Sequence, residues 1–327
     1  MPCRVLVRLA WRILCQTGGV SSHVKKIVAI LIFTLAAGTI NFAQAQRYDE
    51  RYEVEIVSAD DSETTKKIVE NLHNKLPAAL VSKNNINHKK RAGKPIYIAV
   101  GPAALRLSLA QAKDGVIVSS YTSSLTYQNI LENVPPSRRV TVTAVYAEPS
   151  PLQQFQLASM LLKKPLKMAV ILSNKTAHLE PILQHMASRS KIELKIEYFD
   201  GTDSLTKVLN RTADVPAILA MPDGSIYSAE NIRNILVTTY RRNQSVIGFS
   251  SAFVKAGALA STYSEVEDIN VQVNELIADY LVHGNLPEPQ FPKYFSTIIN
   301  ESVAHSLNII VTDNAKTFNR KPVMVQP

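Results

Sequence analysis

The residues that come nearest to catalytic machinery are one serine and two histidines. The segment 248–252 (GFSSA) has the pattern G-x-S-x-A after an apolar run, which is close to but not the same as the nucleophile elbow of serine hydrolases. The histidines that follow it, His283 and His305, have no obvious acidic partner in the sequence. A hydrolase is therefore disfavoured, and a hydrogen bond between Ser250 and a histidine would be needed to support it.

Metal and nucleotide chemistry also lack their usual patterns. His178 and His185 are seven residues apart with Pro181 between them, and no cysteine or carboxylate completes a ligand set, so we expect a surface pair rather than a metal site. The sequence has no G-x-G-x-x-G and no Walker loop. We expect no enzymatic activity, no cofactor and no metal, and any ATP hydrolysis would need a separate subunit.

Alternating strand-like and helix-like runs would have to position any binding residues. Apolar runs that favour strands are bounded by helical patterns, and strands that are apolar on both faces predict parallel sheets covered on both sides. The predicted fold class is α/β, with two doubly wound parallel-sheet halves. The predicted strands are 54–57, 79–81, 96–100, 115–119, 140–146, 168–172, 192–198, 217–221 and 245–249. The predicted helices are 60–76, which begins with a capping box at Asp60 and Glu63, and 103–112, 153–162, 179–187, 204–209, 229–240 and 271–282.

The loops after these strands carry the candidate ligand-binding residues. Ligands of open parallel sheets bind at the carboxyl ends of the strands, where free N–H groups of helix N-termini can hold an anion. The candidates are Gly101, Pro102, Ala103, Tyr121, Thr122, Tyr146, Asp223, Ser225, Ser250 and Ser251.

Each candidate in the first half has a structural alternative. Gly101 allows a ligand to approach the backbone closely, or it forms a plain strand-to-helix turn with Pro102 in the first helical turn. Tyr121 can stack on a flat ligand or donate its hydroxyl, or lie on the surface. Thr122 can bind a carboxylate or cap a helix. Tyr146 can line a cleft or pack at a hinge.

The second-half candidates are equally open. Asp223 can pair with a ligand ammonium group, with Ser225 beside it, or it can serve an Asp-Gly turn. Ser250 and Ser251 can bind ligand oxygens or act locally as helix N-caps.

The net charge is concentrated in the N-terminal segment. The chain of 327 residues has 36 Lys and Arg against 27 Asp and Glu, a net charge of +9. Residues 1–45 hold five of the basic residues and no acidic one, which leaves 31 against 27, or +4. The basic loop 83–94 has no interleaved aromatic residues, so we expect no nucleic-acid partner.

The same N-terminal segment has the pattern of a secretory signal. Lys25 and Lys26 precede the apolar run 27–37, and Ala43-Gln44-Ala45 is an A-x-A cleavage site. The run is short for a membrane anchor. We expect a signal peptide at 1–45 that is cleaved after Ala45, translation that starts at Val24 so that 1–23 are a mis-assigned start, and a soluble periplasmic chain of 282 residues without cysteine or tryptophan.

Five segments together resemble one family. They are 100–104 (VGPAA), 140–145 (VTVTAV) with the helix 153–162 after it, 219–223 (LAMPD), 254–259 (VKAGAL), and 298–304 (IINESVA) with Leu307. Their order and spacing, over residues 52–311, resemble the periplasmic substrate-binding proteins of ABC transporters, in the uncharacterised branch that includes tryptophan- and tyrosine-binding components.

The resemblance implies a type I periplasmic binding protein fold, in which two lobes joined by three crossovers close on a ligand by hinge motion. Lobe 1 would be 47–147 plus 249–282, lobe 2 would be 148–248 plus 283–312, and 313–327 would be a C-terminal tail. The implied partners are a small-molecule ligand, an ABC permease and a separate ATPase subunit. We expect a monomer.

The sequence departs from the family pattern in its ligand loops. Pro102 replaces the usual threonine, 119–122 lacks the usual aspartate, Ala144 replaces glycine, and 264–271 lacks the usual glycine before the last helix. The family resemblance still predicts a periplasmic solute-binding protein for an amino acid or aromatic compound, and these departures favour an alternative. The alternative is a sensor or accessory protein with a degenerate cleft that acts through a protein partner.

Overall fold

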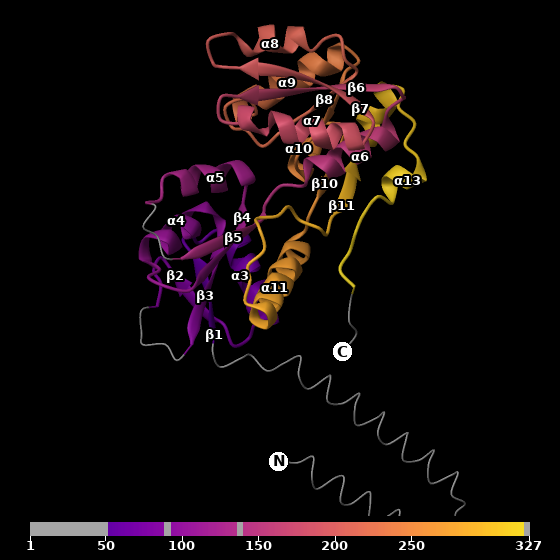
Figure 1. The fold of residues 1–327 in the computed structure, drawn as a ribbon. Coiled ribbons are helices and arrows are strands. Elements are labelled where there is room, and N and C mark those ends of the chain that lie inside the picture. Colours follow the sequence, from indigo (N-terminus) through magenta and orange to yellow (C-terminus); the bar gives the residue numbers. More distant parts are fainter. Residues whose placement is uncertain (1–51, 88–92, 136–139, 324–327) are drawn as a thin grey trace, which may run out of the picture. The chain divides into compact units, whose positions relative to one another are not determined.

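A computed structural model describes residues 52–87, 93–135 and 140–323 (Figure 1). The expected signal peptide and its cleavage site lie outside the described residues, as do residues 88–92 of the basic loop. Two sheets form the molecule, and each has its own helices. The predicted fold class is confirmed, because both sheets are mostly parallel and covered by helices.

The first sheet has five parallel strands in the order β2-β1-β3-β4-β5. We call this sheet and its helices lobe 1. The strands are β1 (Tyr52–Ser58), β2 (Leu80–Lys83), β3 (Lys94–Val100), β4 (Val116–Thr122) and β5 (Thr141–Tyr146), and the helices are α3 (Glu63–Lys75), α4 (Gly101–Gln111) and α5 (Ser124–Glu132). The long helix α11 (Val266–His283) returns to pack against α3 (Figure 1).

The second sheet has six strands in the order β11-β10-β9-β8-β6-β7, and with its helices forms lobe 2. Only the β10–β11 pair is antiparallel. The strands are β6 (Leu166–Ser173), β7 (Ile192–Phe199), β8 (Ala217–Leu219), β9 (Ser245–Ile247), β10 (Ala260–Tyr263) and β11 (Ser296–Ile299). The helices are α6 (Pro151–Leu161), the 3₁₀ turn η1 (Ala177–Leu179), α7 (Glu180–Arg189), α8 (Leu205–Arg211), α9 (Ala229–Arg241), α10 (Ser251–Lys255), α12 (Glu301–Ser306) and α13 (Asp313–Lys316).

Local sequence explains where several helices begin. Ser62, Ser123, Ser204 and Ser228 precede α3, α5, α8 and α9, and each serine side chain accepts an N–H of the first helical turn. The central strands are buried on both faces; Ile96, Ile98 and all their neighbours up to Val100 lie in the core. Caps and apolar runs therefore act together to place each strand end next to a helix start.

The lobe bounds differ from those expected. The structure places α10 and β10 in lobe 2, since Ala260 of β10 pairs with Ile247 of β9. The return to lobe 1 therefore begins after Tyr263 rather than at residue 249. The helix α5 and the strands β10 and β11 were not among the predicted elements.

Buried glutamines hold the connections between the lobes. The chain passes between the sheets at 147–150, 264–265 and 284–295. Gln154 of α6 is 2% exposed, accepts the N–H of Thr262 at 3.1 Å and donates to its hydroxyl at 3.1 Å. Gln272 of α11 accepts the N–H of Lys293 at 2.7 Å and donates to the carbonyl of Phe291 at 3.2 Å. Side-chain amides thus satisfy backbone groups that no sheet reaches.

The C-terminal segment is part of both lobes rather than a tail. Ala315 of α13 is buried in the lobe 2 core, and Arg320 forms an antiparallel bridge with Phe295. Lys321 then forms an ion pair with Asp268 of α11 at 3.1 Å, where Asp268 is 3% exposed. Residues 313–321 therefore pack against folded structure.

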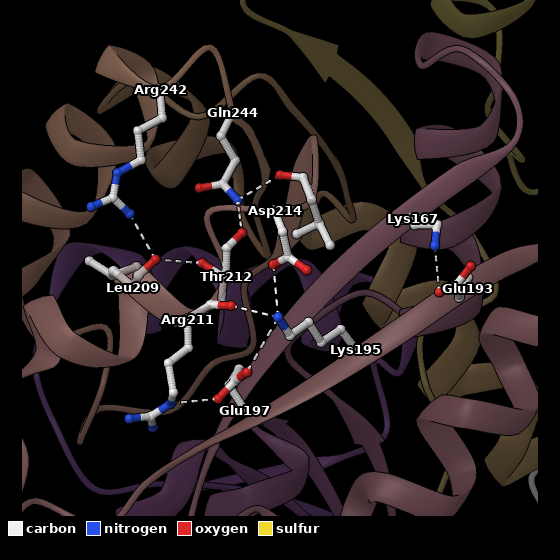
Figure 2. A network of polar contacts seen from close by, with 11 residues as sticks. Lys167, Glu193, Lys195, Glu197, Leu209, Arg211, Thr212, Asp214, Arg242 and Gln244 are labelled. Carbon is white, nitrogen blue, oxygen red and sulfur yellow. Dashed lines mark hydrogen bonds and ion pairs between the residues drawn. The ribbon is translucent and has the colours of Figure 1, made fainter.

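One edge of lobe 2 carries an exposed polar network (Figure 2). Lys195 pairs with Asp214 at 2.8 Å, and Arg211 pairs with Glu197 at 2.7 Å. These pairs are open to water, so each contributes little to stability. The buried Gln244 contributes more, since its amide donates to the carbonyls of Thr212 and Val215 at 2.7 and 2.8 Å. Among the described residues no helix has the length and apolar character needed to cross a membrane.

Gly115 provides a test of this packing. Its φ is +86°, and a Cβ at this position would lie 2.2 Å from the carbonyl oxygen of Pro95. We expect Gly115→Ala to lower the free energy of unfolding by at least about 2 kcal/mol in urea denaturation, because strain and overlap combine. Gly224→Ala is the matched control, since its Cβ would meet no atom within 4 Å. Equal stability of the two variants would contradict the strand packing described here.

Candidate ligand-binding site

Gly101 lies where β3 ends and α4 begins. Its φ is +83°, and no atom lies within 4 Å of the position a Cβ would take. No side chain caps α4, and Pro102 stands in its first turn. Pro102 and Ala103 are exposed. No side chain therefore blocks the free N–H groups at the start of α4. The same strand-to-helix turn is compatible with both alternatives, a ligand loop and a plain turn.

Tyr121 lies at the end of the neighbouring strand β4 in an unusual conformation. Its φ is +56°, which a bulky residue rarely adopts and which marks candidate functional positions. The hydroxyl donates to the carbonyl of Val266 at 3.0 Å and to Oδ1 of Asn270 at 2.7 Å. Burial and the nearby carboxylates of Glu267 and Asp268 raise the pKa of Tyr121. The hydroxyl thus ties β4 to α11, and only the half-buried ring is left to contact a ligand.

Thr122 is 1% exposed and does not cap a helix. Ser123 performs that role for α5, with its hydroxyl accepting the N–H of Thr126 at 3.3 Å. The carbonyl of Thr122 accepts the N–H of Ala147 at 3.1 Å. Its Oγ1 is buried, and no described residue forms a hydrogen bond with it.

Tyr146 packs where the chain leaves lobe 1. Its ring makes edge contacts with Tyr127 and Phe291, with centroids 5.7 and 5.1 Å apart, and its N–H donates to Gln290 at 2.9 Å. Burial, together with the carboxylates of Glu148 and Glu288, raises the pKa of Tyr146 to about 12. The geometry favours hinge packing over cleft lining.

Glu148 is a residue that the candidate set missed. It is 6% exposed, and its Oε1 accepts both the N–H of Ser124, at 2.8 Å, and the Ser124 hydroxyl. The other oxygen, Oε2, is buried with no partner among the described residues. Burial raises the pKa of Glu148 and outweighs the two bonds from Ser124. Nothing in the local sequence distinguishes this carboxylate from an exposed one, because glutamate is rarely buried.

Asp223 is fully occupied inside lobe 2. Its Oδ2 accepts the hydroxyls of Ser173 and Thr176 at 2.6 and 2.9 Å, and its Oδ1 accepts the N–H of Ser225 at 2.9 Å. The residue is 1% exposed, whereas Ser225 itself is exposed. The geometry favours the turn alternative over a bond to a ligand ammonium group.

The remaining candidates also have local roles. Ser250 caps α10 by accepting the N–H of Phe253 at 3.1 Å, and Ser251 is the half-buried first residue of that helix. In the described part of the chain, no hydrogen bond joins Ser250 to a histidine, and His178 instead bonds Gln128 at 2.8 Å. The residues that the structure describes contain no cluster of His, Cys, Asp and Glu that could bind a metal.

Two surface hollows lie away from the candidate residues. One, of about 470 Å³, lies between α4 and α5, and the other, of about 550 Å³, is lined by the ends of lobe 2 elements around Pro165 and Ile309. Neither includes a candidate ligand residue.

Several solved structures share this architecture. No protein-family model matches the chain, and no curated protein sequence matches it. The solved structures that resemble it include the ligand-free, open structure of a substrate-binding protein with adhesive properties from Clostridium difficile, with 12% identity, a TM-score of 0.58, and coverage of 81% of this chain and 97% of that one. The chain has the type I periplasmic binding protein fold.

Two further structures agree. An ABC domain from Streptococcus pneumonia in complex with L-Trp has 14% identity and a TM-score of 0.52, covering 80% of this chain and 97% of that one. A conserved domain protein from Vibrio cholerae has 16% identity and a TM-score of 0.52, covering 81% and 97%. At these identities the likeness establishes the fold of the chain, as the family resemblance in the sequence predicted.

The Tyr121 hydroxyl gives a test of the link between β4 and α11. We expect Tyr121→Phe to lower the free energy of unfolding by about 1–3 kcal/mol, because Asn270 Oδ1, which is buried, loses its donor. Tyr240→Phe is the control, since Tyr240 is 46% exposed on α9. Urea denaturation measures the free energy of unfolding of both variants. A Tyr121→Phe variant as stable as the control would contradict a stabilising bond between β4 and α11.

Proposed function

We propose that the protein is an exported solute-binding protein of an ABC transporter, which binds a small molecule between its two lobes and performs no chemistry on it. The carrying observation is the backbone at the carboxyl ends of two adjacent strands. Gly101 after β3 and Tyr121 in β4 both have positive φ, and β3 pairs directly with β4. This φ is strained for Tyr121 and freely adopted by Gly101, and both residues lie at the strand ends where ligands of open parallel sheets bind.

The similar structures support the same reading. One is named a substrate-binding protein and another was solved in complex with L-Trp, which favours an amino acid or aromatic compound as solute. The mechanism would be equilibrium binding with different affinity for the open and closed arrangements of the lobes. The signal-like segment 1–45 supports export, and a permease with its own ATPase would then receive the solute.

A second candidate is a sensor or accessory protein with the same fold. It is favoured by the loss of free polar groups, because Asp223, the Tyr121 hydroxyl and Ser250 are all engaged in contacts within the chain. In that case a partner protein, and not a solute, would bind one arrangement of the lobes. A solute screen separates the two candidates.

The screen measures thermal unfolding of the purified protein with amino acids, aromatic compounds, sugars and small anions. A solute at 100 times its dissociation constant should add about 2.7 kcal/mol to the free energy of unfolding. X-ray scattering should show contraction of the protein with the same solute. A broad panel that shifts nothing would count against transport and favour the partner-protein candidate.

Gly101 then locates the site. We expect Gly101→Val to weaken binding of any solute found by at least about tenfold, because the added side chain fills the space above the start of α4. Gly284→Val is the matched control: Gly284 also has positive φ and open space around its Cβ position, but it lies at the end of α11. Equal affinity in the two variants would place the solute elsewhere.

A further inference from the structure

We propose that Glu148 is the anionic anchor for a primary ammonium group of the solute. This inference rests on the proposed function and names the chemical class of its ligand. It assigns to Glu148, in the first crossover, the charge recognition that the sequence suggested for Asp223.

The first support is the distribution of unsatisfied oxygens. In the described part of the chain, nine side-chain atoms are buried without a hydrogen-bond partner, and three of them are Thr122 Oγ1, Glu148 Oε2 and Gln153 Oε1. They belong to two segments that are joined by the bonds Ala147 N–H to Thr122 O at 3.1 Å and Ser124 N–H to Glu148 Oε1 at 2.8 Å. An ammonium group has three donors and no acceptor, so oxygens without partners are what it requires.

The second support is charge. No ion pair reaches Glu148 within the described residues, although a buried carboxylate is costly unless it is paired. The N–H and hydroxyl of Ser124, at the start of α5, stabilise one oxygen of the ionised form. Ser124 therefore stabilises a negative charge on Oε1 of Glu148, whereas Oε2 has no positively charged partner among the described residues.

The third support is position. Residues 147–150 form the first of the connections between the lobes. Hinge closure in this kind of fold changes the backbone of such connections. Oε2 is buried in this structure, so the proposal requires that the solute reaches it in an arrangement of the lobes that exposes it.

The titratable groups around the carboxylate leave Glu148 to set the pH dependence. Tyr146 lies near Glu148, since the charges of Glu148 and Glu288 both raise the pKa of Tyr146. Tyr146, with a pKa of about 12, is neutral at ordinary pH, and Glu288 is exposed. Burial raises the pKa of Glu148 above 4.5, so free protein holds a proton there at higher pH than an exposed glutamate does. Binding of an ammonium group would release that proton.

The experiment compares solute pairs that differ only in the amine: L-tryptophan with indole-3-propionate, and L-phenylalanine with 3-phenylpropionate. The full chain is purified as the cell processes it, and calorimetry measures affinity and proton release in buffers of different ionisation enthalpy. We expect the amine to be required, with about 100-fold weaker binding of the deaminated partner. Glu148→Gln should weaken amine binding about 100-fold and leave no further penalty for removing the amine.

The pH profile separates recognition from a structural role. Amine affinity should fall by up to tenfold per pH unit as pH drops below the pKa of Glu148, because the proton and the ammonium compete for one carboxylate. In Glu148→Gln this dependence should disappear. Asp223→Asn is the matched control, a buried carboxylate with every oxygen occupied, and it should keep both the amine requirement and the pH profile.

A second variant keeps the test valid if Glu148→Gln fails to fold. Thr122→Val keeps the side-chain shape, and removal of its unpartnered hydroxyl should weaken amine binding about tenfold while leaving the deaminated solutes unaffected. Equal binding of a solute and its deaminated partner, or wild-type amine affinity in Glu148→Gln, would overturn the proposal while the solute-binding function stands. A protein that binds no solute of any class would overturn both.

Discussion

The connections between the two lobes must satisfy backbone polar groups that lie outside the two main sheets. Gln272 meets this constraint with a side-chain amide that accepts the N–H of Lys293, 21 residues away in sequence, and Gln154 accepts the N–H of Thr262, at the end of β10 next to the second connection. Gln290 meets it with its backbone, which bonds Ala144 and Tyr146 at the edge of the first sheet.

The two buried carboxylates of the strand ends show opposite solutions to one problem. Asp223 has donors on both oxygens and is complete within its own lobe. Glu148 has donors on one oxygen only. A buried carboxylate whose two oxygens both accept hydrogen bonds can stabilise a turn. A buried carboxylate with one unpaired oxygen is stabilised further by a proton or a cation. The difference between the two residues therefore lies in their surroundings and not in their chemical type.

Sequence reasoning recovered the architecture because buried parallel strands are nearly continuous apolar runs, as in Ile96–Val100. It missed β10 and β11, which are short strands with the partly polar sequences ASTY and STII, and it missed α5, which has only nine residues. It found Tyr121 at a strand end, but its hydroxyl partner Asn270 is 149 residues away. It could not rank Asp223 against Glu148, because the partners that decide between them come from elements distant in sequence.

The bond between Lys321 and Asp268 has a mechanical consequence. The chain crosses between the lobes three times, yet its C-terminal segment packs in lobe 2 through Ala315 and then reaches the long helix of lobe 1. This makes a fourth strap, held by an ion pair and not by a continuous backbone link. If the lobes move apart as the proposed function requires, this ion pair would have to break or move with them. The pair lies on the same helix, α11, that receives the Tyr121 hydroxyl, so the C-terminal segment and β4 are both attached to one element.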